Sequence, residues 1–171
     1  MKRYLFLTLA VLLCTLSASA YDFKVDGIAY NKNDDGKSVR VASGVDYKGD
    51  IVIPENMTYD GVTYSVTSIG ENAFSGCTGL ASVTIPNTVS FIGDVAFEET
   101  PWYNNQPDGV FYIGDVAYKF KGGMASGTAI YIKEGTVSIS PGAFRGCTGL
   151  TSVTIPNSVA EIGFDTFQGC I

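Results

Sequence analysis

The amino-acid sequence predicts a β-rich α/β solenoid, a right-handed superhelix of about four coils with a 23-residue period. Two nested repeats carry this prediction. The string GCTGL-x-SVTIPN spans Gly76 to Asn87 and returns 70 positions later, from Gly146 to Asn157. Within that long period, Phe74 is followed 23 residues later by Phe97. Periods of roughly 20–50 residues are typical of stacked units that bury their apolar faces only against one another.

Residues 1–20 are predicted to be a Sec signal peptide outside the fold. Two basic residues precede an apolar run, and small residues at 18–20 offer cleavage after Ala20. The alternative is a lipoprotein acylated at Cys14, although Leu13 stands where such signals usually carry a small residue. The apolar run is short for a transmembrane helix. We therefore expect a secreted or cell-surface protein that is not transmembrane.

Residues 21–48 are predicted to form an N-terminal β cap. Apolar side chains alternate with polar ones in this stretch, and a turn-rich loop follows at 31–36. A stack of repeats needs a cap because its first coil otherwise exposes the core to water. The alternating apolar positions are Phe23, Val25, Ile28, Tyr30, Val39 and Val41.

Residues 49–171 are predicted to hold the repeat units, and the segment that begins at Leu80 illustrates one of them. Leu80, Val83 and Ile85 follow L-x-x-L-x-L spacing, which is typical of the strand in a leucine-rich repeat. Pro86 ends the strand because proline has no N–H to donate. The chain then returns to the core and reaches a phenylalanine on the opposite wall. The four predicted strand cores are 51–53, 83–85, 130–132 and 153–155.

These segments closely resemble the BspA-like leucine-rich repeats of secreted and surface proteins from Bacteroides and its relatives. The strings IPNTVSFIGDVAF and AFSGCTGLASVTIP are similar to the family unit I-P-x-x-V-x-x-I-G-x-x-A-F-x-x-C-x-x-L-x-x-V/I. The resemblance covers most of the chain after the signal peptide. It implies the leucine-rich repeat fold. At the level of the class it also implies an adhesive or recognition module, with host matrix proteins among the ligands of some members.

An insertion at about 98–122 separates the second predicted strand from the third. Two β-prone runs flank Gly114-Asp115, which predicts a β-hairpin. The insertion also contains Trp102, the single tryptophan, followed by Tyr103. Two interpretations stay open. The aromatic side chains pack the hairpin onto the repeats, or some of them form a platform for a sugar or a protein side chain.

Three cysteines share one position of the repeat. Cys77, Cys147 and Cys170 each follow a repeat phenylalanine by three residues, and Thr100 takes this position in the remaining unit. A position that accepts cysteine or threonine favours small, buried side chains with free thiols. A disulfide between Cys147 and Cys170 is the alternative in a secreted chain.

The composition disfavours catalysis, metal binding and nucleic-acid binding. The chain has no histidine, which removes Ser-His-Asp and Cys-His arrangements. A loop at 31–36 is similar to a calcium loop, but Ala42 stands where the bidentate glutamate is needed. The net charge is −6, and the acidic balance lacks the basic patch that phosphate binding requires. We expect no enzyme activity, no cofactor and no metal.

The predicted function is recognition of a protein or glycan, with a host matrix protein as one candidate, through the outward face of the repeat strands. The alternative is a structural spacer or a truncated fragment of a longer surface protein. Small hydroxylated residues dominate this face, and Tyr131 is its single large side chain. These outward positions can also be plain β-favouring surface. The candidate contact residues are Thr84, Tyr131, Lys133, Thr154, Trp102 and Tyr103.

The final unit ends where its next strand should begin. Gly169-Cys170 aligns with the two earlier Gly-Cys pairs, which are followed by Thr-Gly-Leu and a strand. We therefore expect an uncovered apolar edge at the C-terminal end, which invites pairing with another copy. A truncated gene product or a final unit that frays would also fit this pattern.

Overall fold

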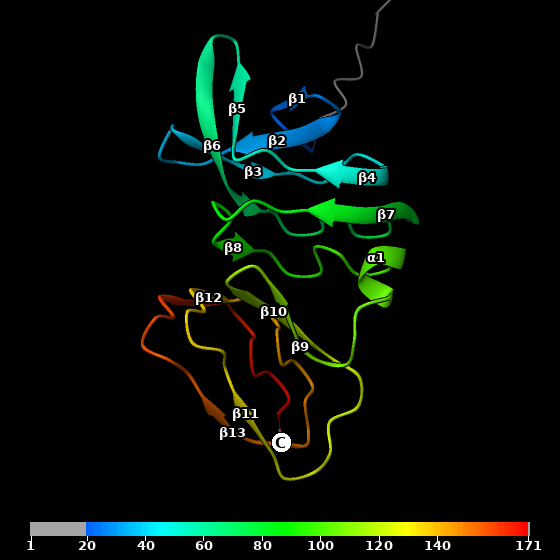
Figure 1. Cartoon of the computed structure of the whole chain (residues 1–171), viewed down its shortest axis with the longest axis vertical. Coiled ribbons are helices and arrows are strands. Elements are labelled where there is room, and N and C mark those ends of the chain that lie inside the picture. Colours follow the sequence, from blue (N-terminus) through cyan, green and yellow to red (C-terminus); the bar gives the residue numbers. More distant parts are fainter. Residues whose placement is uncertain (1–19, 171) are drawn as a thin grey trace, which may run out of the picture.

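The computed structural model describes residues 20–170, which form fourteen short strands and a single four-residue helix. The fold is β-rich, as predicted. Its strands follow one another along the long axis of the molecule, from the N-terminal sheet to β13 at the other end (Figure 1). Residues 1–19 of the predicted signal peptide, with the alternative lipoprotein site at Cys14, lie outside the described residues.

An antiparallel meander begins the fold. It consists of β1 (Phe23–Val25), β2 (Ile28–Lys32) and β3 (Ser38–Val41). The third strand then pairs in parallel with β6 (Val62–Ile69), which pairs in parallel with β8 (Phe91–Ile92). The meander therefore continues directly into a ladder of repeat strands. A domain boundary at 48/49 stays a prediction.

A second hairpin, which the sequence analysis does not predict, joins this sheet. β5 (Asn56–Tyr59) pairs antiparallel with the first half of β6. The two strands are connected by Asp60 and Gly61, whose φ angles are 49° and 74°. Positive φ at both central positions is what a type I′ hairpin turn requires, and Asp-Gly is a favoured sequence for it.

The four predicted strand cores form two separate parallel pairs. β4 (Lys48–Val52) pairs with β7 (Gly79–Thr84), and β11 (Thr128–Tyr131) pairs with β13 (Leu150–Thr154). The first pair lies in the upper half of Figure 1 and the second pair in the lower half. The insertion separates them.

The insertion contributes one strand to a second ladder of parallel strands, which is separate from the ladder of β3, β6 and β8. It contains α1 (Pro101–Asn104) and the hairpin of β9 (Gly109–Ile113) and β10 (Val116–Lys121). The hairpin turns at Gly114-Asp115, as predicted. β10 then pairs in parallel with β12 (Ser138–Ile139), which pairs in parallel with β14 (Glu161–Ile162). The insertion is thus built into the stack of strands.

Aromatic rings stack along the core. The centroid of Phe97 lies 5.0 Å from that of Phe74 and 5.7 Å from that of Tyr118. All three side chains are at most 1% exposed. Burial of such rings is the largest apolar contribution that single side chains make to a fold. The insertion therefore continues the aromatic core between the second and third repeat units.

The three cysteines described are free thiols, as the packing interpretation predicts. Cys77 and Cys147 are buried, and burial raises the pKa of both thiols. The Cys170 thiol donates a hydrogen bond of 3.0 Å to the carbonyl oxygen of Phe144. Thr100, at the equivalent position, donates one of 2.7 Å to the carbonyl oxygen of Phe97. Both side chains reach the backbone of a repeat phenylalanine, Thr100 that of its own unit and Cys170 that of the preceding unit.

Candidate binding surface

The outward side chains of β4 and β7 form one part of the candidate surface. Val52 lies opposite Thr84, and Asp50 lies opposite Ser82. The Ser82 hydroxyl donates a hydrogen bond of 2.6 Å to the Asp50 carboxylate. Val52 is 65% exposed although it is aliphatic. This part of the surface therefore combines one exposed apolar side chain with small hydroxyl groups.

The outward side chains of β11 and β13 form the other part. Tyr131 lies opposite Thr154 and is 76% exposed. Its neighbours Ile130 and Ile132 face the core, as the alternation of a strand requires. Exposed Lys133 follows the strand, and its backbone N–H donates a hydrogen bond of 3.0 Å to the Tyr112 hydroxyl. The fold thus presents a large aromatic side chain from a strand whose alternate residues pack against the core.

The structure does not join these two parts through one ladder. Thr84 belongs to the β4–β7 pair, and Tyr131 belongs to the β11–β13 pair. The outward face of the repeat strands is divided between two strand pairs because the insertion lies between β7 and β11. Thr84 therefore has Val52 and Ser82 as neighbours, while Tyr131 has Thr154.

Trp102 and Tyr103, the two candidate residues in the insertion, are half-buried in an aromatic cluster. The Trp102 ring lies 4.8 Å from Phe97 and 5.8 Å from Phe111 between centroids. The Lys121 ammonium lies 4.7 Å from the Tyr103 ring centroid and donates a hydrogen bond of 2.7 Å to the Tyr103 carbonyl oxygen. These contacts favour the interpretation in which the aromatic residues pack the insertion onto the repeats.

Burial also affects Tyr103 directly. It raises the pKa of Tyr103 to about 12, with a further contribution from the Glu98 carboxylate. The phenol therefore stays neutral at physiological pH. A ring packed in this way has less surface for a ligand than Tyr131 has.

A cluster of charged groups connects the insertion to the units on either side. The Lys119 ammonium lies 3.3 Å from Asp94 and 3.2 Å from Glu98, and Arg145 lies 2.8 Å from Asp94. The Tyr118 hydroxyl donates a hydrogen bond of 2.5 Å to Glu98. Burial, more than the nearby Glu98 carboxylate, raises the pKa of Tyr118. Glu98 thus accepts a hydrogen bond from Tyr118 and pairs with Lys119, which ties it to the hairpin of the insertion.

The sequence analysis missed this cluster. Asp94 is separated from Lys119 by 25 residues and from Arg145 by 51 residues. Lys119 comes from the insertion, and Asp94 and Arg145 come from loops of different repeat units. Spacing within one segment of the sequence cannot predict contacts between such distant residues. They could have been predicted only by aligning the repeat units and knowing how the insertion folds back between them.

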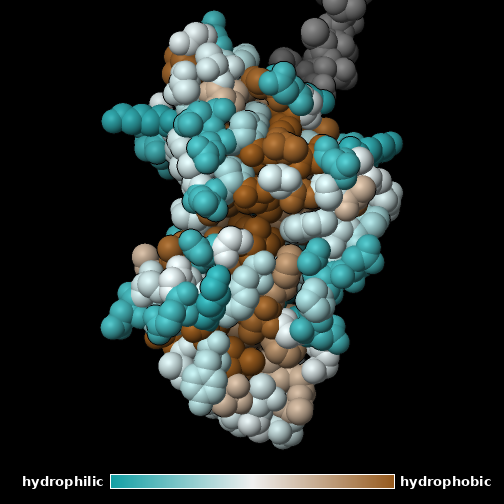
Figure 2. Space-filling view, viewed as in Figure 1, coloured by the Kyte–Doolittle hydropathy of each residue, from teal (hydrophilic) through white to brown (hydrophobic). Residues whose placement is uncertain are grey.

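An apolar face lies at the C-terminal end of the described residues. A cavity of about 330 Å³ opens there. Phe164 is 61% exposed and Ile162 is 47% exposed. Figure 2 shows hydrophobic side chains in a band along the long axis of the molecule, with hydrophilic side chains on both margins. The cavity is lined by Leu150, Thr151, Ser152, Val153, Ile155, Phe167 and Cys170.

Strands that carry L-x-x-L-x-L spacing, recur within a 23-residue unit and pair in parallel are typical of a leucine-rich repeat protein, and the fold belongs to this class. The chain belongs to the BspA type leucine rich repeat region family, which matches residues 54–171 in six copies. A comparison with curated proteins gives no match. Within residues 20–170, no helix is long and apolar enough to cross a membrane.

Three solved structures are similar to this chain. A leucine-rich repeat protein from Bacteroides ovatus is 28% identical with a TM-score of 0.49, covering 88% of this chain and 45% of that one. A leucine rich cell surface protein from Faecalibacterium prausnitzii is 20% identical with a TM-score of 0.46, covering 86% and 52%. A T. pallidum leucine rich repeat protein is 20% identical with a TM-score of 0.44, covering 87% and 67%. The chain thus spans about half the length of the first two structures.

Proposed function

We propose that this chain is a secreted or cell-surface binding module that recognises a protein or glycan, with a host matrix protein as one candidate, and performs no catalysis. Its repeat units stack as a right-handed solenoid, and the outward side chains of the strands contact the ligand. Residues 1–20 direct the chain to the secretory route. Family membership supports this class of function, since repeat stacks of this kind offer extended surfaces for recognition.

The exposure of Tyr131 is the observation that carries the proposal. An aromatic side chain that is 76% exposed gains little for the stability of the fold. Tyrosine is instead enriched at interfaces, because it brings a large apolar ring and a polar hydroxyl with few rotatable bonds. Thr154 and Lys133 add a hydroxyl and a cation beside it. This set suits both protein and sugar surfaces.

A ligand screen tests the proposal. Purified chain 21–171 is immobilised and exposed to matrix proteins, mucins and glycans, beside a Tyr131→Ala variant and a Tyr59→Ala control from the N-terminal sheet. We expect saturable binding of at least one ligand that Tyr131→Ala loses and Tyr59→Ala keeps. Binding by neither wild type nor control across a broad panel would contradict a recognition function.

The alternative is a structural spacer or a fragment of a longer surface protein. The apolar C-terminal face favours it, because such a face is normally covered by a further repeat or by another copy. In the chain as it stands, we propose self-association through this face. β13 and β14 lie at the edges of their sheets and offer backbone groups for pairing.

Sedimentation velocity of chain 21–171 tests the self-association. Ile162→Lys places a charge on the face, and Val62→Lys is the matched control, since both side chains are 47% exposed on strands. We expect concentration-dependent association that Ile162→Lys abolishes and Val62→Lys leaves intact. A monomer at every concentration would exclude self-association through this face.

A further inference from the structure

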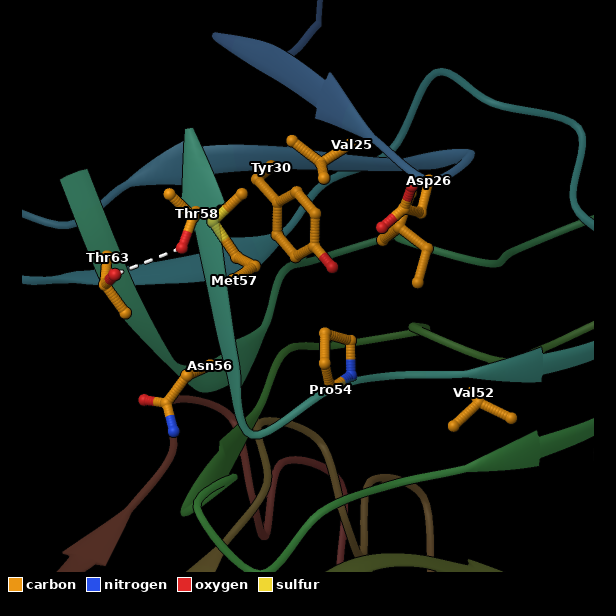
Figure 3. A pocket seen from close by; sticks show the side chains of 10 residues that line it. Val25, Asp26, Tyr30, Val52, Pro54, Asn56, Met57, Thr58 and Thr63 are labelled. Atoms are coloured by element: carbon orange, nitrogen blue, oxygen red, sulfur yellow. Dashed lines mark hydrogen bonds between the residues drawn. The ribbon is translucent and has the colours of Figure 1, made fainter. Parts of the chain in front are cut away.

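A second cavity lies at the N-terminal end, between the β1–β2 hairpin and the chain around β5 (Figure 3). Its volume is about 420 Å³, which is within the range of sites for small ligands or single side chains. The candidate contact residues named from the sequence do not line it. Apolar side chains form much of its wall, among them Val25, Ile28, Val52, Pro54 and Met57.

A buried phenol points into this cavity. Tyr30 is 1% exposed, and its hydroxyl is directed toward the space between Asp26 and Pro54 (Figure 3). Among residues 20–170, no hydrogen bond joins this hydroxyl to another protein group. Tyr47 and Tyr118 are buried to a similar degree, and both of their hydroxyls have protein partners. The Tyr30 hydroxyl is not among the fully buried unpaired polar atoms, so it faces the open space of the cavity and is accessible to a ligand atom.

Asp26 gives the cavity its charge. Of the ten residues that line the cavity, Asp26 alone has a carboxylate, and none is a lysine or an arginine. Burial, followed by the neighbouring Tyr47 and the Asp26 carboxylate, raises the pKa of Tyr30 to about 12. The phenol is therefore neutral, and the lining carries one negative charge and no positive one. A cation is favoured in such a cavity, and an anion is repelled.

We propose that this cavity binds a lysine side chain of a partner protein. The aliphatic stem would pack against Val25, Ile28 and Met57, while the ammonium would pair with the Asp26 carboxylate and donate a hydrogen bond to the Tyr30 hydroxyl. A lysine matches these groups because it places one compact cation at the end of an apolar stem. The net charge of −6 also favours approach of a basic partner.

This site goes beyond the proposed function, because it lies apart from the Tyr131 surface and can exist without it. Val52, which lines the cavity and lies opposite Thr84, connects it to the upper part of the candidate surface. One partner could therefore contact both. The site is nevertheless testable with a small probe alone.

The test is a titration of ¹⁵N-labelled chain 21–171 followed by amide chemical shifts. The probe is Nα-acetyl-lysine N-methylamide, and its matched control is the norleucine analogue, which has an aliphatic chain of similar length without the ammonium. We expect saturable shifts at residues 25–30 and 56–58 with the lysine probe, and affinity weaker by about tenfold for the norleucine control. A parallel titration with N-acetylglucosamine tests whether the cavity prefers a sugar.

Two conservative variants locate the contacts. Asp26→Asn removes the charge, and asparagine tolerates the positive φ of 47° at this position. Tyr30→Phe removes only the hydroxyl. We expect Asp26→Asn to weaken the lysine probe about tenfold and Tyr30→Phe to weaken it severalfold, while Tyr131→Ala leaves it unchanged.

Three results would overturn the lysine site. The first is an affinity for the norleucine control equal to that for the lysine probe. The second is an affinity of Asp26→Asn for the lysine probe equal to that of the wild type. The third is that N-acetylglucosamine shifts the amides around this cavity and the lysine probe does not. The first and third use the wild-type chain, so they decide the matter even where a variant fails to fold. Failure of the Tyr131 surface in the ligand screen would leave these results unaffected.

Discussion

The rings of Phe74 and Phe97 stack with centroids 5.0 Å apart and planes inclined by 6°. Phe144 and Phe167 repeat this geometry at 5.6 Å and 9°. Each pair is separated by 23 residues in the sequence, so equivalent positions of consecutive units superpose in the core. Between the pairs, the insertion supplies Tyr118, whose ring meets Phe97 edge-on. The aromatic stack is the feature through which one unit positions the next.

Phe97→Ala should therefore destabilise the fold strongly. Phe97 is fully buried and contacts rings from both neighbouring segments, so its removal should lower the free energy of unfolding by about 3–5 kcal/mol. Urea denaturation measures this change. Phe164→Ala, at a 61% exposed position, should change it by no more than about 0.5 kcal/mol. Equal effects of the two variants would show that the stack does not organise the core.

Gly149→Ala and Gly79→Ala form a matched pair at one position of the repeat. A methyl group on Gly149 would collide with the backbone carbonyl of Ala125, which cannot move alone. A methyl group on Gly79 would meet the Lys48 side chain, with Cγ at 2.7 Å. The Lys48 side chain is 70% exposed and can change its rotamer. We expect a loss of about 1–3 kcal/mol for Gly149→Ala and much less for Gly79→Ala. Thermal denaturation of both variants distinguishes them, and the reverse order would contradict the close packing of Gly149 against Ala125.

Asp94 should make stability depend on acid pH. Burial alone would raise its pKa, but the hydrogen bond from Arg145 and the charge of Lys119 outweigh burial and lower the pKa below 3.8. A carboxylate with a lowered pKa stabilises the fold above its unfolded value, and this contribution is lost as the pH falls through the folded value. Stability from Asp94 is thus complete at neutral pH and declines below about 3.8.

Asp94→Asn tests this dependence. We expect a loss of about 1.5–3 kcal/mol at neutral pH, since the variant weakens hydrogen bonds to two charged groups. The loss should shrink as the pH is lowered below 3.8, because the wild type then also loses the charge. Urea denaturation across this range measures both. A difference between the two proteins that stays constant with pH would rule out the contribution of the Asp94 charge.

The repeat pattern predicted β4, β7, β11 and β13, because spacing and alternation are local properties. Of the predicted strand core 83–85, residues 83 and 84 lie in β7. The pairing continues one residue beyond β4, because the Ile53 N–H donates a hydrogen bond of 3.0 Å to the Thr84 carbonyl oxygen. The β5–β6 hairpin was missed although Asp60-Gly61 was a usable signal. The role of β10 as a repeat strand was missed for another reason. Its pairing with β12 depends on how the insertion folds back, which spacing alone does not report.

The candidate site was predicted less completely. Alternation placed Tyr131 and Thr154 correctly on the outward side of a strand pair. It could not show that the insertion divides the outward face of the repeat strands, nor that Trp102 is half-buried against Phe97. The cavity beside Tyr30 is formed by segments distant in the sequence, so only the folded chain brings its lining together.

Titration of wild type and Tyr131→Ala with the ligand found in the screen tests the central claim most directly. Tyr131 is 76% exposed, so its loss should leave the melting temperature unchanged while weakening binding by about tenfold or more. Calorimetry gives both affinities, and thermal denaturation of the same samples gives both melting temperatures. Equal affinities for the two proteins would contradict recognition through the β11–β13 face. If Tyr131→Ala lowered both the affinity and the melting temperature, Tyr131 would instead contribute to the stability of the fold.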